Sequence, residues 1–116
     1  IKYNAKNEEA AERYAQIADH IGLGGTTTTE KVDALIAELR SMNDQLDIPQ
    51  AIKFYGAGGV KAETSIIDEA EFLEKLPTVA ANAIGDACTG SNPRQPSQEE
   101  MEKLLKACYY DLEIDF

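Results

Sequence analysis

The sequence contains no tryptophan, two cysteines and one histidine. Cys88 and Cys108 are too few for a disulfide framework, and together with His20 they match no zinc-ligand spacing. No run of about 18 consecutive apolar residues is present, so no segment is long enough to cross a bilayer as a helix. A basic and then apolar N-terminal segment of the secretory kind is also absent. We therefore expect a cytoplasmic protein with reduced thiols.

Basic residues are scarce, and this excludes two classes of partner. The 116 residues carry 11 Lys plus Arg against 21 Asp plus Glu, which gives a formal net charge of −10. A surface of this charge repels phosphate backbones and anionic lipid headgroups. We therefore expect no nucleic-acid partner and no membrane partner. The length accommodates one domain, residues 1–116, with a single core.

No motif for a nucleotide or a metal is found. Gly-x-Gly-x-x-Gly is absent, and the run from Gly56 to Gly59 lacks the Gly-Lys-Ser/Thr that completes a P-loop. The acidic residues do not form the pattern of a calcium loop. His20 has no second ligand near it in sequence, so we interpret it as a last-turn residue that faces the helix dipole. The chain alone is expected to hold no metal and no nucleotide cofactor.

The N-terminal half of the sequence predicts two long helices and a short one. The first covers about residues 8–21, with apolar residues at helical spacing and Gly22 as its stop. The second follows a capping box that extends from Thr27 to Glu30. Pro49 is expected to start the short helix, which ends near Phe54. The predicted apolar face of the second helix comprises Val32, Leu35, Ile36, Leu39, Met42 and Leu46.

The C-terminal half predicts the remaining helices. Residues 56–65 break all periodicity and are expected to form a flexible surface insertion. Asp68 and Ser97 each precede a glutamate by three residues and mark two helix starts, whereas Pro77 is expected to begin a new helix. Five or six helices with short connections predict an all-α bundle or array. The predicted buried stripe of the last helix comprises Met101, Leu104, Leu105 and Cys108.

One segment of the chain is distinctive. The run from Asp86 to Arg94, Asp-Ala-Cys-Thr-Gly-Ser-Asn-Pro-Arg, is similar to the Asp-x-Cys-Thr-Gly-x-Asn-Pro-Arg signature near the C-terminus of iron-containing (group III) alcohol dehydrogenases. Weaker matches agree with it in order and spacing. Asp47 stands where this family usually has Gly. The resemblance covers essentially the whole chain, and the weaker matches are Lys2-Tyr3-Asn4, the run from Arg13 to Ala18, and Ile48-Pro49 followed by Ile52-Lys53.

The resemblance implies a fold and a set of cofactors. Such enzymes have an N-terminal α/β domain that binds NAD(P) and a helical, dehydroquinate-synthase-like C-terminal domain. Fe(II), or Zn(II) in some members, is held between them by one Asp and three His, and it polarises the oxygen of the alcohol or carbonyl during hydride transfer. The last of these ligands precedes the Lys-Tyr-Asn match. The resemblance therefore implies a helical C-terminal part that lacks the nucleotide-binding domain and all four ligands, and that is inactive alone.

The resemblance also implies a role for Cys88. The family's cysteine at this position lines the cleft near the nicotinamide and the substrate, so we expect Cys88 to line the substrate pocket. The alternative is a buried cysteine at a helix end. A small, mildly apolar thiol can shape an alcohol pocket without competing for the proton. A catalytic thiolate is not expected, because hydride transfer requires no nucleophile and no His adjoins Cys88.

The other residues of this loop are expected to have structural roles. Thr89 and Asn92 can hydrogen-bond backbone groups of the turn, and Gly90 is expected to supply a positive φ. Arg94 is expected to anchor the loop to a carboxylate or to helix-end carbonyls. Asp86 is expected to cap the preceding helix or to pair with Arg94. Cys108 is expected to belong to the core.

Two functions of different classes stay open at this stage. In the first, the chain is the C-terminal part of an iron-dependent alcohol dehydrogenase, either a stand-alone enzyme or a bifunctional aldehyde-alcohol dehydrogenase. In the second, it is a non-catalytic acidic helical interaction module. The absent initiator Met, the lack of a metal site and the loop at Cys88 favour the first. Its partners are then an N-terminal nucleotide-binding domain and a small alcohol or aldehyde, and homo-oligomerisation stays open.

Overall fold

The computed structural model describes all residues 1–116 and contains four α-helices. The all-α class is therefore confirmed, but the number of helices is smaller than the predicted five or six. Four 3₁₀ turns connect or precede the helices, and Tyr55 and Lys61 form an isolated β-bridge. The elements in order are η1 (Asn4–Lys6), α1 (Glu8–His20), α2 (Thr28–Gln45), η2 (Ile52–Phe54), η3 (Ala57–Gly59), α3 (Glu69–Gly85), η4 (Thr89–Ser91) and α4 (Gln98–Tyr110).

Side-chain caps determine where the helices begin. The Thr27 hydroxyl accepts from the Glu30 N–H at 3.2 Å, and the Glu30 carboxylate accepts from the Thr27 N–H at 3.1 Å. Ser97 and Glu100 form the same reciprocal pair at the start of α4. Asp68 accepts from the backbone of the third residue of α3 at 3.0 Å. These contacts confirm the three predicted helix starts, because each satisfies an N–H group that has no partner inside its helix.

Two proline predictions are wrong. Pro77 lies inside α3, which runs without interruption from Glu69 to Gly85. A proline removes one backbone hydrogen bond and crowds the preceding turn, but neighbouring turns can keep the helix continuous at that cost. Pro49 starts no α-helix either, because the only helical element near it is the three-residue turn Ile52–Phe54. These two differences account for the smaller number of helices.

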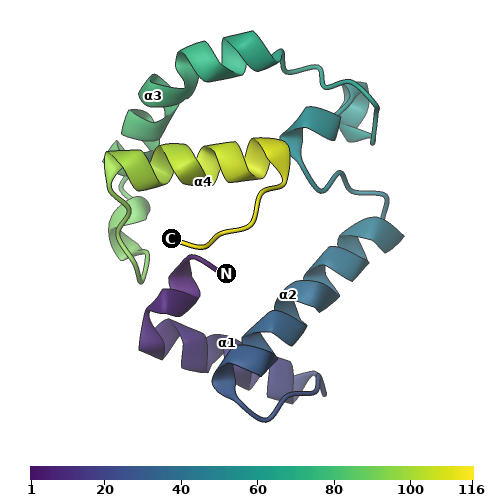
Figure 1. Cartoon of the computed structure of the whole chain (residues 1–116), viewed down its shortest axis with the longest axis vertical. Helices are drawn as coiled ribbons and strands as arrows, with labels where there is room; N and C mark the ends of the chain where they lie inside the picture. Colours follow the sequence, from purple (N-terminus) through teal and green to yellow (C-terminus); the bar gives the residue numbers. More distant parts are fainter.

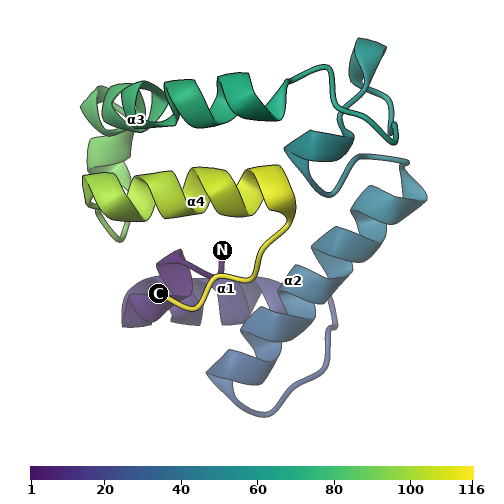
Figure 2. The same cartoon turned by 45° about the horizontal axis from the view of Figure 1, so that its top comes forward.

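The helices form two pairs that are joined by the ends of the chain. α1 packs against α2, and α3 lies beside α4 (Figures 1 and 2). The segment after α4 turns back and runs toward the N-terminus, so both termini lie close together in the two views. The ring centroids of Tyr3 and Phe116 are 6.0 Å apart. The two helix pairs therefore meet where the first and last residues of the chain lie.

The chain is more open than a compact monomer of its size. Its radius of gyration is 15.7 Å, whereas a compact domain of this length has about 13 Å. Its accessible surface is 7525 Å², compared with about 6,200 Å² for a folded monomer of this mass. No helix is long and apolar enough to span a bilayer. The surplus of roughly 1,300 Å² means that much apolar surface is left uncovered within this chain.

Some residues that were expected to be buried are exposed. Leu39 and Met42 of α2 and Leu46, which follows its last residue, are 40%, 45% and 64% exposed, because the C-terminal half of this helix extends away from its neighbours. The prediction that Cys108 belongs to the core is also wrong, since its side chain is exposed on α4. Its neighbours Ala107 and Tyr109 are the buried residues there. The buried surface of α4 is thus centred on a different helical position from the predicted one.

Candidate functional site

The loop after α3 is held against the last turn of that helix. The Asp86 carboxylate accepts from the Cys88 N–H at 2.8 Å, and the Thr89 hydroxyl donates to the Ala83 carbonyl at 2.5 Å. Asp86 directly follows Gly85, the last residue of α3. Ser91 closes the turn by donating to the Cys88 carbonyl at 2.7 Å. These contacts place Cys88 at the beginning of η4 with its side chain exposed.

Cys88 borders an open pocket between three parts of the chain. The pocket has a volume of about 390 Å³ and lies between the first residues, the Cys88 loop and α4. Ile1, Met101 and Leu104 supply apolar surface, whereas the two asparagines supply amides. The residues that line it are Ile1, Tyr3, Asn4, Cys88, Thr89, Asn92, Pro96, Met101 and Leu104. Cys88 is therefore at the wall of a cavity and not buried at a helix end.

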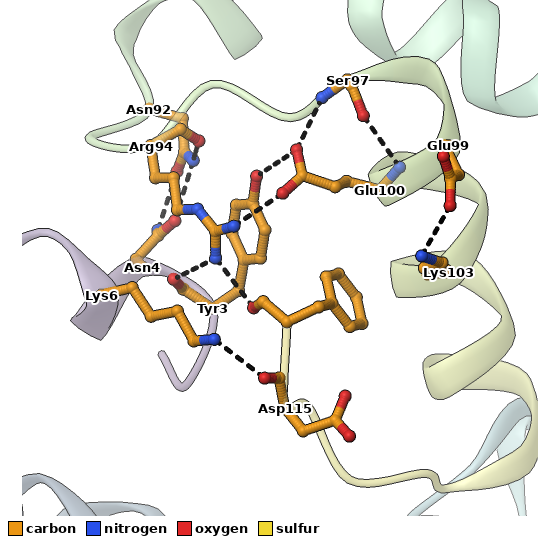
Figure 3. A network of polar contacts seen from close by, with 11 residues as sticks. Tyr3, Asn4, Lys6, Asn92, Arg94, Ser97, Glu99, Glu100, Lys103 and Asp115 are labelled. Carbon is orange, nitrogen blue, oxygen red and sulfur yellow. Dashed lines mark hydrogen bonds and ion pairs between the residues drawn. The ribbon is translucent and has the colours of Figure 1, made fainter.

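Two asparagines from opposite ends of the sequence pair across this pocket. The Asn4 amide donates to the Asn92 side-chain oxygen at 2.8 Å, and the Asn92 amide donates back to Asn4 at 2.9 Å (Figure 3). Asn92 also donates to the Arg94 carbonyl at 2.5 Å. Both side chains are half-buried, so these polar groups need partners within the protein. The pair fixes the N-terminal segment to the Cys88 loop.

Arg94 joins three segments of the chain through its guanidinium group. Its Nη2 donates to Glu100 Oε1 at 2.6 Å, and its Nη1 donates to the carbonyls of Phe116 and Tyr3 at 2.9 and 3.3 Å. The guanidinium also lies over the Tyr3 ring, 3.9 Å from the ring centroid. Figure 3 shows Arg94 between Tyr3 and Glu100. Several donors in a plane and a stacked face are typical of Arg and are not available to Lys.

The charges around Arg94 are complementary. The Ser97 backbone N–H and the Arg94 charge lower the pKa of Glu100 below its usual range, against an opposing effect of desolvation. Burial raises the pKa of the Tyr3 phenol, and the neighbouring Glu100 carboxylate adds to this effect. At neutral pH, Glu100 is therefore ionised and Tyr3 is neutral, so the phenol can donate to the carboxylate at 3.3 Å. The charges of Arg94 and Glu100 therefore hold the segments together, and no proton is exchanged between Tyr3 and Glu100 at neutral pH.

The structure also differs from several expectations about this loop. Asp86 bonds the backbone of Cys88 and does not pair with Arg94. Arg94 contacts a carboxylate, as expected, but the carbonyls that it contacts lie at the chain ends and not at a helix end. The expected positive φ at Gly90 is wrong, because this residue is not among those with positive φ. A Cβ atom at Gly90 would meet open space, so the loop geometry does not require glycine there.

Sequence reasoning missed the partners of the loop. The sequence pattern predicts only a capping role for Glu100, and no pattern indicates a role for Phe116. Tyr3 and Asn4 were noted only for their resemblance to a family motif. These residues are separated from Asn92 and Arg94 by most of the chain length, so no local pattern links them. The one available signal was that the Lys2-Tyr3-Asn4 match and the loop motif belong to the same family pattern.

The chain's own residues do not form a metal site. No group of three or more His, Cys, Asp or Glu side chains is close enough to hold an ion. His20, the last residue of α1, is exposed, and both thiols are exposed at separate positions. This donor set does not fit the iron or zinc that the family resemblance implies.

A second cavity of about 560 Å³ lies between η2, the segment before α3 and the end of α4. The hydroxyl groups of its two tyrosines are already hydrogen-bonded. The Tyr110 hydroxyl donates to Glu69 at 2.5 Å, which raises the pKa of Tyr110 to about 12. Tyr109 donates to the Ile67 carbonyl at 3.0 Å. Because its aromatic hydroxyls serve the fold, the pocket at Cys88 is the better candidate site.

Comparison with known proteins identifies the family. Residues 1–109 match the model of the Fe-containing alcohol dehydrogenase family, C-terminal part. The chain belongs to the iron-containing alcohol dehydrogenase family. The match includes the Cys88 loop, α4 up to Tyr109 and the N-terminal segment with Asn4. The residues that surround the pocket thus lie within the matched part of this family.

Relatives in the family are much longer than this chain. An NADPH-dependent butanol dehydrogenase of Clostridium saccharobutylicum is 44% identical over 116 residues, which cover all of this chain and 27% of that protein. A bifunctional aldehyde-alcohol dehydrogenase of Escherichia coli is 36% identical over 125 residues, covering 95% of the chain and 13% of the relative. An alcohol dehydrogenase of Thermococcus barophilus is 32% identical over 111 residues, which cover 96% of this chain and 25% of that protein. The chain thus spans about a quarter or less of these relatives.

Proposed function

We propose that this chain is the C-terminal helical part of an iron-dependent, NAD(P)-linked alcohol dehydrogenase. In this proposal it forms one wall of the cleft in which hydride passes between a small alcohol and NAD(P). The observation that carries the proposal is the family match over residues 1–109. The pocket at Cys88 supports it, because the most specific motif of the sequence lines a cavity of about 390 Å³. In this role the chain contributes surface and no reacting group.

The shape of the chain supports docking onto a larger body. The surplus surface of roughly 1,300 Å² exceeds the roughly 800 Å² that one partner buries in a standard interface. Leu39, Met42 and Leu46 form part of an uncovered apolar face on α2. Contiguous exposed apolar residues on a monomer can mark an interaction surface. We propose that an N-terminal nucleotide-binding domain, of the kind that the family resemblance implies, covers this surface.

Cys88 has the properties that a substrate-pocket residue needs in this proposal. Its thiol is exposed at the pocket, and Met101 and Leu104 lie on the same cavity. The site can therefore accept the alkyl part of a small alcohol or aldehyde next to a soft, weakly polar group. A neutral thiol beside the alcohol does not take up the hydroxyl proton that the alcohol loses during oxidation. The metal is proposed to bind to another part of the enzyme, because no cluster of His, Cys, Asp or Glu in this chain fits it. NAD(P) is proposed to bind there too, because the sequence lacks a Gly-x-Gly-x-x-Gly motif.

Two enzyme architectures are compatible with this proposal. The relatives include a butanol dehydrogenase and a bifunctional aldehyde-alcohol dehydrogenase, and both contain a segment similar to this chain. The identity is higher to the first, at 44% against 36%. We therefore propose the stand-alone enzyme and keep the bifunctional one as the second candidate. A coding frame that also encodes an aldehyde dehydrogenase part would decide for the second.

The proposal is tested in the full-length enzyme by comparing two cysteine variants. Cys88→Val adds bulk at the pocket, whereas Cys108→Val makes the same exchange on an exposed position of α4 outside the pocket lining. We expect NAD(P)-dependent oxidation of alcohols by the parent enzyme. We expect Cys88→Val to lower kcat/KM for the larger alcohols about tenfold relative to ethanol, since one methylene in a substrate pocket has effects of this order. The Cys108 variant should show the parental ratio.

Two results would contradict the proposal. If the full-length enzyme oxidises no alcohol with either nicotinamide cofactor after loading with Fe(II) or Zn(II), the dehydrogenase assignment fails. If the enzyme is active but the two cysteine variants have the same ratio of kcat/KM values, the assignment of Cys88 to the substrate pocket fails while the enzyme class stands. Circular dichroism of each variant shows whether a lost activity reflects lost folding.

A further inference from the structure

The Asn4–Asn92 pair is a contact that depends on the polarity of both amides. Each side chain donates one hydrogen bond and accepts one, at 2.8 and 2.9 Å. An aspartate at either position would place two acceptor oxygens opposite each other. The shape of the residue would stay nearly the same, but one or both bonds would be lost. The pair can therefore be broken by a change that adds no volume.

The pair is also restrained from the side of the loop. Asn92 uses its amide a second time to donate to the Arg94 carbonyl at 2.5 Å. The Arg94 side chain is in turn fixed by Glu100 and by the Tyr3 ring, at 2.6 and 3.9 Å. Arg94 and Glu100 are 24% and 27% exposed, so their ion pair is partly shielded from water. The orientation of Asn92 is therefore set by a network that extends to α4.

The pair connects two opposite walls of the pocket. Ile1, Tyr3 and Asn4 lie on the N-terminal wall, and Cys88 and Asn92 lie on the loop wall. No other side chain–side chain hydrogen bond in the structure joins these two walls. The separation of the walls, and thus the room beside Cys88, depends on this double hydrogen bond together with the contacts of Arg94 to the Tyr3 carbonyl and the Tyr3 ring, at 3.3 and 3.9 Å.

We propose that the Asn4–Asn92 pair determines substrate specificity by setting the width of the pocket beside Cys88, with Arg94 as its positioning residue. This inference rests on the proposed function and defines its substrate class more closely. A pocket whose walls are hydrogen-bonded to each other, with apolar surface from Met101 and Leu104, is expected to accept an unbranched alkyl chain better than a branched one. We therefore expect the pair to favour unbranched over branched alcohols and aldehydes.

The test compares 1-butanol with its branched isomer 2-methyl-1-propanol in the full-length enzyme. Asn92→Asp removes both donor bonds of Asn92 without added volume. We expect the preference for the unbranched alcohol to fall about five- to tenfold, since a pocket contact of this kind changes discrimination by that order. The change should appear in KM more than in kcat, because the pair acts on the fit of the alkyl chain. Asn4→Ser breaks the same pair from the other wall and should have the same direction.

Two further variants separate positioning from general stability. Arg94→Ala should reproduce the loss of preference, and Arg94→Lys should restore part of it by keeping the charge opposite Glu100. Ser65→Ala is the matched control, because it removes a half-buried hydrogen bond to the Ile52 carbonyl at 2.9 Å outside the pocket lining. We expect this control to lower stability slightly and to leave the preference at the parental value. A structural role alone would move the control and the Asn92 variant together.

The outcomes distinguish this inference from the proposed function. If Cys88→Val shifts alcohol selectivity while Asn92→Asp and Asn4→Ser leave the preference within about twofold of the parent, the inference is overturned and the proposed function stands. If the parent oxidises no alcohol, both fail. Should Asn92→Asp not fold by circular dichroism, Asn4→Ser decides, because it leaves the loop and its contact to Arg94 intact. A fall in preference in the Ser65 control as large as that in Asn4→Ser also overturns the inference.

Discussion

The C-terminal end of α2 contains an aspartate where its backbone favours glycine. Asp47 has a φ of 54°, and the backbone hydrogen bonds around it are those of a Schellman motif. The Ile48 N–H donates to the Asn43 carbonyl at 2.8 Å, and the Asp47 N–H donates to the Asp44 carbonyl at 3.2 Å. α1 ends in the same motif with Gly22, whose φ is 76°. No hydrogen bond or ion pair of the Asp47 side chain is found. Asp47→Gly should therefore remove strain without removing a contact.

The expected gain follows from three contributions. An L-residue in the left-handed region costs roughly 1–2 kcal/mol, with Asp at the low end of this range. A carboxylate at the negative end of the helix dipole adds roughly 0.3–1 kcal/mol of destabilisation. Glycine offsets roughly 0.4–1 kcal/mol of these two gains, because it increases the conformational freedom of the unfolded chain and so stabilises the unfolded state. Asp47→Gly should thus raise the free energy of unfolding by about 1 kcal/mol, or Tm by about 4 °C.

Urea and thermal unfolding of the 116-residue chain, followed by circular dichroism at 222 nm, measure this change. Asp47→Asn is the first control, because it removes the charge and keeps a residue that tolerates positive φ. It should gain only the dipole contribution. Gly22→Asp is the reverse exchange at the matching position of α1, where a Cβ would meet no atom within 4 Å. By the same three contributions with opposite sign, it should destabilise by about 1 kcal/mol.

The reasoning would be refuted by two patterns of results. If Asp47→Asn gained as much as Asp47→Gly, the effect would come from charge and the backbone argument would be wrong. If Asp47→Gly were neutral or destabilising while Gly22→Asp were harmless, the left-handed conformation would carry no cost at these helix ends. The m value, which is the slope of the free energy of unfolding against urea concentration, must be the same in the parent and the variants, since a change in m would indicate an altered unfolded state.

Two further predictions concern pH and cofactors. The hydrogen bonds from the Thr26 hydroxyl and backbone, followed by that from the Thr27 N–H, lower the pKa of Glu30 to about 2. Because this pKa is lower in the folded state than in the unfolded state, the ionised carboxylate stabilises the fold above the usual pKa of 4.5, and the stabilisation is lost as the pH falls toward 2. The free energy of unfolding of Glu30→Gln should therefore depend less on pH between these two values than that of the parent. The isolated chain should show helical circular dichroism and bind neither NAD(H) nor stoichiometric Fe or Zn, and tight metal binding measured by elemental analysis would contradict the division of sites proposed here.

The helix starts could be predicted from the sequence because their causes are local. Thr27, Asp68 and Ser97 each lie three residues before a glutamate, and each side chain bonds the N–H of that residue in the structure. The same holds for the end of α1, where Gly22 takes the expected left-handed conformation. All these contacts span five residues or fewer. A pattern in the sequence is therefore sufficient to locate them.

The burial of helix faces could not be predicted equally well. Leu39, Met42 and Leu46 follow a clear helical period, but this period shows only that one face seeks a partner. It does not show that the partner belongs to the same 116 residues. Pro77 illustrates a second limit, because the cost of a proline inside a helix can be offset by packing of the rest of α3, which the local sequence does not reveal.

The candidate site was predicted only in part for the same reason. The motif located Cys88, and the structure places it on a pocket, yet the opposite wall comes from the first four residues. Contacts such as Asn4 with Asn92 join positions 88 residues apart. The sequence contains no period or spacing that marks such a pair. Its discovery required the path of the chain, which brings both ends to the Cys88 loop.

The network around Arg94 explains why the two helix pairs and the pocket form one unit. A single guanidinium bonds the first segment through Tyr3, the last segment through Phe116 and α4 through Glu100. The Glu100 carboxylate also accepts from the Ser97 N–H at 2.9 Å, so the residue that caps α4 is the same one that orients Arg94. The start of α4, the chain ends and the Cys88 loop are therefore fixed by shared atoms. A substitution in any of these three parts should therefore alter the pocket, because each part shares hydrogen bonds with another part of the network.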